Sequence, residues 1–160
     1  MSEIKELVIY KLQNEHGNDG IQNIVCKIIE KSYAAKKRCL LLCNSEAEVE
    51  LFDSKLWTYS KLSFIPHGSK YSVDNNDAIH CKIWISDSVV YINSPDYLIN
   101  LGHAVFNKFN MNNAQKQFER IIDITCDVND NIETVKNKYN VNFAKCTLWI
   151  QTNNKWVKSN

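Results

Sequence analysis

The amino-acid sequence predicts a single α/β domain over residues 1–160, with an open, mostly parallel, twisted sheet flanked by helices in a Rossmann-like arrangement. Strand-like apolar runs alternate with helical patterns through the first half of the chain, which is the order that builds parallel sheets. A length of 160 residues suits one domain with a proper core and is too short for two ordinary domains. The glycines are too sparse for a phosphate-binding loop, since they stand only at Gly17, Gly20, Gly68 and Gly102.

The chain opens with a predicted strand and a predicted helix. Residues 5–12 are apolar and rich in β-branched and aromatic side chains, which predicts a strand. Residues 21–36 carry apolar side chains at spacings of three and four, and Asp19 stands before them in an N-cap position. This pattern predicts the first helix.

A second strand and helix follow directly. Residues 39–44 are apolar on both faces, as expected for a parallel strand with helices on either side. Ser45 and Glu48 then have the spacing of a capping box, in which each residue satisfies a backbone amide near the other. The second helix is predicted to run from this cap through Trp57.

The second half of the chain predicts fewer helices. The expected elements are strands over 81–87 and 118–126, an apolar run over 97–101, a helix over 129–139, and short edge strands over 147–151 and 155–157. Residues 89–92 are expected to continue the strand over 81–87 or to pair with it, and Asp123 is expected to interrupt the strand over 118–126.

Charge and hydropathy exclude several classes of protein. The 19 basic and 18 acidic residues leave a formal net charge of +1, so the chain lacks the overall positive charge of a nucleic-acid binder, and any charge-driven binding must be local. The sequence shows no signal peptide and no apolar run of the roughly 18 residues that a membrane span needs. We therefore expect a cytoplasmic protein without membrane contact, whose six cysteines are buried thiols.

Catalytic and metal-binding chemistry finds little support in the sequence. His67, His80 and His103 could meet a cysteine in space, but none has the spacing of a metal site or of a Cys-His pair. Asp87 and Asp123 end or interrupt predicted strands, and capping or solvation at an edge accounts for both. We expect no cofactor, no metal and no catalytic activity of the chain itself.

Two features remain that chemistry does not explain. The segment 51–68 gathers aromatic side chains, among them Trp57 and Phe64, with a proline and a glycine, and it is either core or a contact surface. From Thr134 onward the chain carries five lysines around Tyr139 and no Asp or Glu, which is either a solvated face or a cationic site for an acidic peptide. Together the two features favour an interaction module.

Four short motifs agree in order and spacing with those of a known family. They are Leu56-Trp57, Ser63-Phe-Ile-Pro-His67, Ile121-Ile-Asp-Ile124 and Lys136-Asn-Lys-Tyr139. With the strand and helix order around them, they resemble the chi subunit of bacterial DNA polymerase III. Members of that family are non-catalytic accessory subunits of the clamp loader with an open α/β sheet and no phosphate loop. The resemblance therefore implies that fold here, and a role in DNA replication.

The resemblance also implies a partner on the clamp-loader side. In the family, a face that includes the Leu-Trp segment binds the psi subunit, and that face corresponds here to Leu56 and Trp57, with Tyr59 beside them. Where psi is missing, an equivalent clamp-loader protein or a helicase would take its place.

A second implied partner is the single-stranded-DNA-binding protein. Basic residues and a tyrosine on the late helix of the family bind the acidic C-terminal tail of that protein, and Lys136, Lys138 and Tyr139 fall at the matching positions. DNA would then be contacted only indirectly. Ile132 and Asn140 stand where the family carries basic residues, so the resemblance implies a weakened tail site.

Two other functions stay open from the residues alone. The alternation of strands and helices also permits a nucleotide-binding regulator or enzyme on a Rossmann-like sheet. Direct DNA binding is a third possibility, against which the near-zero net charge argues.

Overall fold

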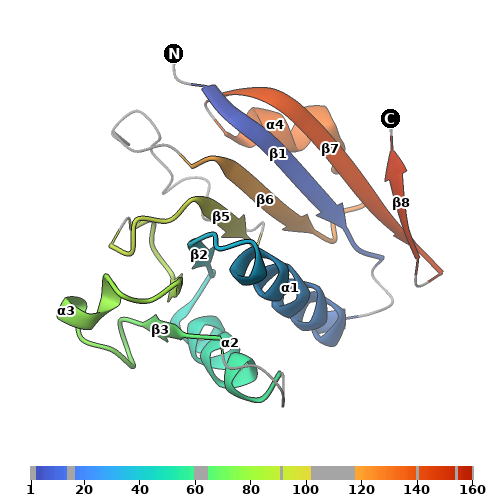
Figure 1. The fold of residues 1–160 in the computed structure, drawn as a ribbon. Helices are drawn as coiled ribbons and strands as arrows, with labels where there is room; N and C mark the ends of the chain where they lie inside the picture. Colours follow the sequence, from blue (N-terminus) through green and yellow to red (C-terminus); the bar gives the residue numbers. More distant parts are fainter. Residues whose placement is uncertain are drawn as a thin grey trace.

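The computed structural model describes residues 3–13, 17–59, 65–90, 92–101, 118–139, 141–153 and 155–159, which contain eight strands and four helices (Figure 1). The strands are β1 (Glu3–Lys11), β2 (Cys39–Leu42), β3 (His67–Ser69), β4 (Ile83–Ser86), β5 (Tyr97–Asn100), β6 (Arg120–Thr125), β7 (Asn142–Thr152) and β8 (Lys155–Ser159). The helices are α1 (Gly17–Ala34), α2 (Glu46–Tyr59), α3 (Asn75–Ala78) and α4 (Ile132–Lys138).

All eight strands belong to one sheet, in the order β3-β4-β2-β5-β6-β1-β7-β8. Every neighbouring pair is parallel except β7 and β8, which form an antiparallel hairpin at one edge. This open, mostly parallel sheet with its helices confirms the predicted α/β class. The first strand along the chain, β1, lies inside the sheet between β6 and β7.

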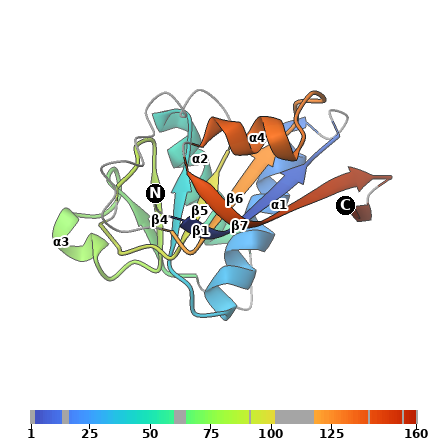
Figure 2. The same cartoon turned by 90° about the horizontal axis from the view of Figure 1, so that it is seen from above.

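Helices cover both faces of the sheet. On one face α1 and α2 pack over a core that includes Val25, Ile29 and Phe52. On the other face α4 contributes Val135, and its C-cap contributes Tyr139. Figure 2 shows α1 and α4 on opposite sides of the strands. Strands β2, β4 and β5 are buried along their whole length, which accounts for their apolar sequences; the polar exceptions are Ser86 and Asn100 at the ends of β4 and β5. No described helix is both long enough and apolar enough to cross a membrane.

The helix starts follow the sequence with two differences. Ser45 Oγ accepts a hydrogen bond from the Glu48 amide at 3.2 Å, as the capping box predicts. The Glu48 carboxylate reaches the backbone amide of Asn44 at 3.1 Å, one residue before the expected partner. The N-cap prediction for Asp19 was wrong, because α1 begins at Gly17 and places Asp19 in its first turn. A negative charge there interacts favourably with the helix dipole.

Two details of the strand predictions in the second half were wrong. Val89 and Val90 lie outside the strands, and the loop after them is held by Asn93, whose side-chain amide donates to the carbonyl oxygens of Cys39 and Cys81 at 3.1 Å each. The run over 147–151 belongs to the longer strand β7, which pairs with β1 as well as with β8 and is therefore not an edge. The edge strand at this side of the sheet is β8.

The Pro66-His67-Gly68 sequence leads into a strand. Gly68 lies in β3, where a Cβ atom would stand 2.7 Å from the side chain of Val73, so a larger residue does not fit. Three other residues singled out in the sequence, Phe64, His103 and Asn140, lie outside the described residues.

Candidate functional site

Trp57 projects from the last turns of α2 with 57% of its surface exposed. The buried stripe of the helix is made by Val49, Phe52 and Leu56, and the next residue along a helix is turned away by about 100°. The indole ring lies against His67 of β3, with ring centroids 5.0 Å apart and an interplanar angle of 61°. An exposed tryptophan that is held on one side is the kind of side chain that anchors protein interfaces.

His67 supports Trp57 from inside the protein. Its imidazole is buried, with Nδ1 2.7 Å from the carbonyl oxygen of Ile65 and Nε2 3.0 Å from that of Asp53. The same Nε2 lies 3.2 Å from the Asp53 carboxylate. Asp53 precedes Trp57 by four residues, so one side of α2 contacts the histidine twice. The sequence indicated His67 only as a weak metal or Cys-His candidate; the structure shows that it joins β3 to α2.

The other two residues predicted for this surface point elsewhere. Leu56 is 4% exposed and belongs to the core. Tyr59 is half-buried and packs on that core, where burial, with smaller effects of Glu30 and Cys26, raises the pKa of its phenol. Of the three, Trp57 is the one that presents a large exposed surface.

The second predicted surface is on α4, a short helix whose first turn is stabilised by side-chain hydrogen bonds. Asn131 Oδ1 accepts a hydrogen bond from the Thr134 amide at 2.9 Å, and Thr134 Oγ1 accepts one from the Asn131 amide at 2.7 Å, which completes a capping box. At the other end of the helix, Lys138 Nζ lies 3.2 Å from both carboxylate oxygens of the buried Asp130. Asp130 therefore fixes the position of Lys138.

Lys136 lies on the side of α4 that faces β7. It is half-buried, and its positive charge acts on the thiol of Cys146 in β7, where it offsets part of the rise in pKa that burial causes. Ile132 on the same helix is also half-buried and packs against the core. The structure thus brings Lys136 and Lys138 onto one short helix.

Tyr139 lies inside the protein and not on its surface. It is 3% exposed, and its ring meets that of Phe143 edge-on, with centroids 5.9 Å apart. Its hydroxyl donates a hydrogen bond to Asp123 Oδ2 at 2.6 Å and accepts one from Asn100 Nδ2 at 2.8 Å. Asn100 and Asp123 are register partners on β5 and β6. Tyr139 therefore fastens the end of α4 to the middle of the sheet.

Asp123 does not interrupt β6, as the sequence suggested, but continues it as a fully buried carboxyl group. Burial raises the pKa of Asp123 to about 6, against the lowering effects of the hydrogen bond from Tyr139 and the charge of Lys138. Its Oδ1 atom has no hydrogen-bond partner among the described residues. Burial also raises the pKa of Tyr139 well above its ordinary value, so the phenol stays protonated and donates.

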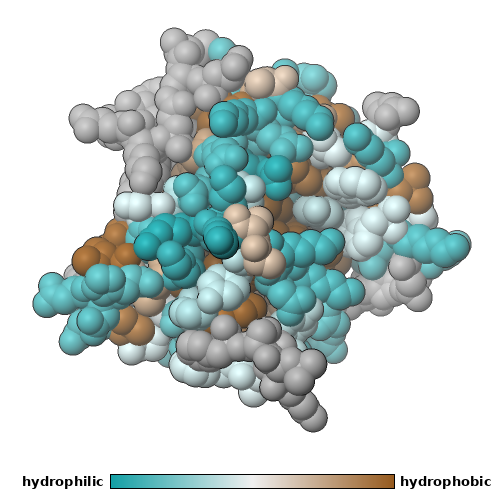
Figure 3. Space-filling model, in the orientation of Figure 1, coloured by the Kyte–Doolittle hydropathy of each residue, from teal (hydrophilic) through white to brown (hydrophobic). Residues whose placement is uncertain are grey.

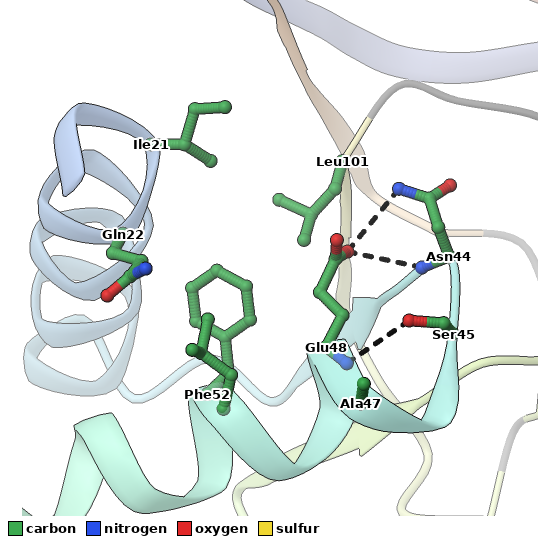
Figure 4. A pocket seen from close by; sticks show the side chains of 9 residues that line it. Ile21, Gln22, Asn44, Ser45, Ala47, Glu48, Phe52 and Leu101 are labelled. Atoms are coloured by element: carbon green, nitrogen blue, oxygen red, sulfur yellow. Dashed lines mark hydrogen bonds between the residues drawn. The ribbon is translucent and has the colours of Figure 1, made fainter. Parts of the chain in front are cut away.

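A hollow of about 340 Å³ lies where a nucleotide-binding sheet would have its crevice, beside the ends of β2 and β5 and the start of α2. Figure 4 shows Asn44, Ser45 and Glu48 along one wall with Leu101 beside them, and Ile21 and Gln22 of α1 across from them. The Glu48 carboxylate accepts hydrogen bonds from the backbone and side-chain amides of Asn44, and Ser45 Oγ accepts a hydrogen bond from the Glu48 backbone amide. A phosphate at this helix start would meet a carboxylate, so the hollow does not suit a nucleotide.

The described thiols do not form a reactive site. Cys26, Cys39 and Cys43 are buried and free, and burial raises the pKa of Cys26 to about 11 and that of Cys39 to about 12. Thiols that stay protonated are poor nucleophiles and poor metal ligands. In the described part of the chain, no three His, Cys, Asp or Glu side chains gather as metal ligands would. Cys81, Cys126 and Cys146 are free and half-buried, so the prediction of buried thiols holds for three of the six.

Comparison with known proteins gives one family. Residues 5–144 match the sequence model of the family described as DNA polymerase III chi subunit, HolC. The chain is 31% identical over 124 residues to the probable DNA polymerase III subunit chi of Rickettsia prowazekii (strain Madrid E), which covers 77% of this chain and 73% of that protein. It is also 31% identical over 67 residues to the DNA polymerase III subunit chi of Escherichia coli (strain K12), which covers 40% and 46% respectively.

Proposed function

The chain belongs to the DNA polymerase III chi subunit family, and we propose that it is a non-catalytic accessory subunit of the clamp loader that bridges two partners. Family membership makes it a subunit of DNA polymerase III that acts in DNA replication. One proposed partner is the psi subunit, or an equivalent clamp-loader protein or helicase. The other is the acidic C-terminal tail of the single-stranded-DNA-binding protein.

The exposure of Trp57 is the observation that carries this proposal. A tryptophan with more than half of its surface in water offers a large apolar contact area. The buried His67, itself in contact with the half-buried Asp53, holds this one in a fixed direction. A side chain that is already held in one orientation loses little conformational freedom when a partner binds, which favours it as an interface anchor. In this proposal Leu56 and Tyr59 contribute from inside, because they set the position of the last turns of α2.

The tail surface is proposed on α4. Lys136 and Lys138 supply positive charge for the carboxylates of the tail, and the half-buried Phe143 and Ile132 lie near them as apolar neighbours for its aromatic end. Tyr139 contributes from beneath through its hydrogen bonds to the sheet. Lysine is a point charge without the two-pronged geometry of arginine, so we expect a contact that weakens strongly with salt.

A capture experiment tests the bridging role. Immobilised Trp57→Ala should keep its fold and lose capture of purified psi, or of the clamp-loader complex, by at least tenfold, as expected of an interface hot spot. Leu51→Ala is the matched control, because Leu51 is 45% exposed on the same helix. Equal capture by the two variants, with thermal unfolding showing both folded, would contradict the proposal.

A further inference from the structure

A groove runs between α1 and the hairpin of β7 and β8, away from both surfaces proposed above. Its hollow of about 270 Å³ is lined by Tyr10, Trp149 and Trp156 on the sheet side and by residues of α1, among them Lys27 and Lys31. A second hollow of about 410 Å³ adjoins it toward the start of α1 and shares Lys27 and Trp156. The face that carries α1 is largely hydrophilic, with small apolar patches (Figure 3).

Three aromatic rings form the floor of this groove. Tyr10 of β1 and Trp149 of β7 are register partners, so their side chains leave the sheet on the same face. The ring of Trp156 meets that of Tyr10 edge-on, with centroids 5.4 Å apart and an interplanar angle of 88°. All three are half-buried and pack against the core. Each ring is therefore held in place by the core while part of it stays accessible.

Two lysines line the groove from α1, and a third lies on β8 beside its aromatic floor. Lys27 and Lys31 are exposed and one turn apart on α1, and the exposed Lys158 of β8 is opposite Trp149 in the register. The ion pairs recorded among the described residues do not involve these lysines.

Few carboxylates oppose these charges. Glu6, whose charge acts on Tyr10, is paired with Arg120 at 2.9 Å, and Asp19 lines only the adjoining hollow. The groove is thus positively charged although the whole chain is nearly neutral.

We propose that this groove binds single-stranded nucleic acid, with bases stacked on Trp149 and Trp156 and phosphates along Lys27, Lys31 and Lys158. Proteins that bind single strands combine a cationic groove with aromatic side chains, because every base offers a ring face whatever the sequence. An acidic peptide would pair with the lysines, but its acidic side chains have no flat rings to stack on the three aromatic side chains. A duplex keeps its bases stacked within itself, so it would lose the aromatic part of the contact.

Part of this site lies outside the match to the family. The family model matches residues 5–144, which include Tyr10, Lys27 and Lys31 but end before Trp149, Trp156 and Lys158. It also lies on the α1 side of the sheet, whereas α4 with the proposed tail surface lies on the opposite side (Figure 2). The inference therefore does not depend on the proposed bridging role.

Anisotropy of a labelled oligothymidylate, titrated with the full chain at several salt concentrations, tests the lysines. Lys27→Ala/Lys31→Ala should weaken binding, and it should reduce the slope of log affinity against log salt by about 1.4, because each lost phosphate contact on a single strand accounts for about 0.7. Lys5→Ala/Lys82→Ala is the matched control, since it removes two exposed lysines outside the groove. No binding at low salt, or equal affinities of the two double variants, would overturn the proposal.

A second pair of variants tests the rings. Trp156→Leu should lose at least about fivefold in affinity while Trp156→Phe retains most of it, since stacking on an aromatic ring contributes about 1–3 kcal/mol per base. Thermal unfolding checks that both variants fold. Competition by unlabelled polyglutamate as strong as that by unlabelled oligothymidylate would assign the groove to an acidic peptide instead. Equal competition by duplex DNA would show that charge alone accounts for the binding. Either result refutes the proposal.

Discussion

The hydroxyl of Tyr139 donates a 2.6 Å hydrogen bond to the carboxyl group of Asp123, and both side chains are buried. The bond joins the C-cap of α4 to the centre of β6. Lys136 and Lys138 stand on the last turn of that helix, so an inner hydrogen bond sets the position of the outer positive charges. Stability of the sheet and the geometry of the proposed tail surface are linked through this pair.

Asp123→Asn should remove a pH-dependent loss of stability. The pKa of Asp123, about 6, lies above its ordinary value of 3.8, so the folded protein binds this proton more tightly than the unfolded chain does. The resulting stabilisation is fully present below about pH 4 and is lost as the pH rises through 6, which amounts to about 3 kcal/mol. Urea denaturation across this range should show the free energy of unfolding falling in the wild type and falling much less in the variant. The exposed Asp74→Asn is the control, and parallel curves for all three proteins would rule out the assignment.

Tyr139→Phe should lower the free energy of unfolding by about 1–3 kcal/mol, because it leaves the buried Asp123 and Asn100 without their shared partner. Tyr71→Phe removes a hydroxyl that donates to Asp87 at 3.2 Å on the surface, and it should cost less than about 0.5 kcal/mol. Chemical denaturation of the two variants at one pH measures the difference. Similar costs would mean that the buried network contributes little.

His67→Ala should weaken capture of the proposed clamp-loader partner although Trp57 itself is unchanged. The substitution removes the ring against which the indole lies and the contacts with Asp53, so the indole gains freedom that binding must remove again. We expect a loss of several-fold, smaller than that of Trp57→Ala. The exposed His80→Ala serves as control; wild-type capture by a folded His67→Ala would show that Trp57 needs no support.

Lys136→Ala should weaken binding of a synthetic acidic tail peptide, and the effect should be larger at low salt than at moderate salt, because dissolved ions screen the attraction between a partly exposed lysine and the peptide carboxylates. Isothermal titration at the two salt concentrations measures it. Lys155→Ala removes an exposed lysine from β8 and should leave the peptide affinity unchanged. Equal affinities of the wild type and Lys136→Ala at both salt concentrations would exclude the α4 surface as the tail site.

Local patterns predicted most of the fold. The apolar runs at 5–12 and 39–44 correspond to β1 and β2, and the cap at Ser45 starts α2. These signals are local, because periodicity and capping depend on neighbours in the chain. The prediction failed at Asp123, whose place in β6 depends on a hydroxyl 16 residues away. A carboxylate in an apolar strand can be placed only when its partner is known.

The candidate site was predictable to a smaller extent. The sequence singled out Trp57 and Tyr139 together, yet one is exposed and the other buried. Aromatic side chains suit cores and interfaces equally well, so composition cannot separate the two cases. The support from His67 was missed because its contacts come from Asp53 on α2 and from the backbone of Ile65, which only the fold brings together.

The place of β1 between β6 and β7 has a consequence for biosynthesis. Val8 pairs with Ile122 on one side and with Thr147 on the other, so during synthesis β1 has neither of these partner strands until more than a hundred further residues have been made. Contacts so distant in sequence form slowly, since the long loop must close before they contribute. Until then β1 is an apolar segment with two unpaired edges, open to association with other nascent chains. A chain that stops before β7 keeps one of those edges exposed, so the C-terminal hairpin is part of what protects the newborn protein from aggregation.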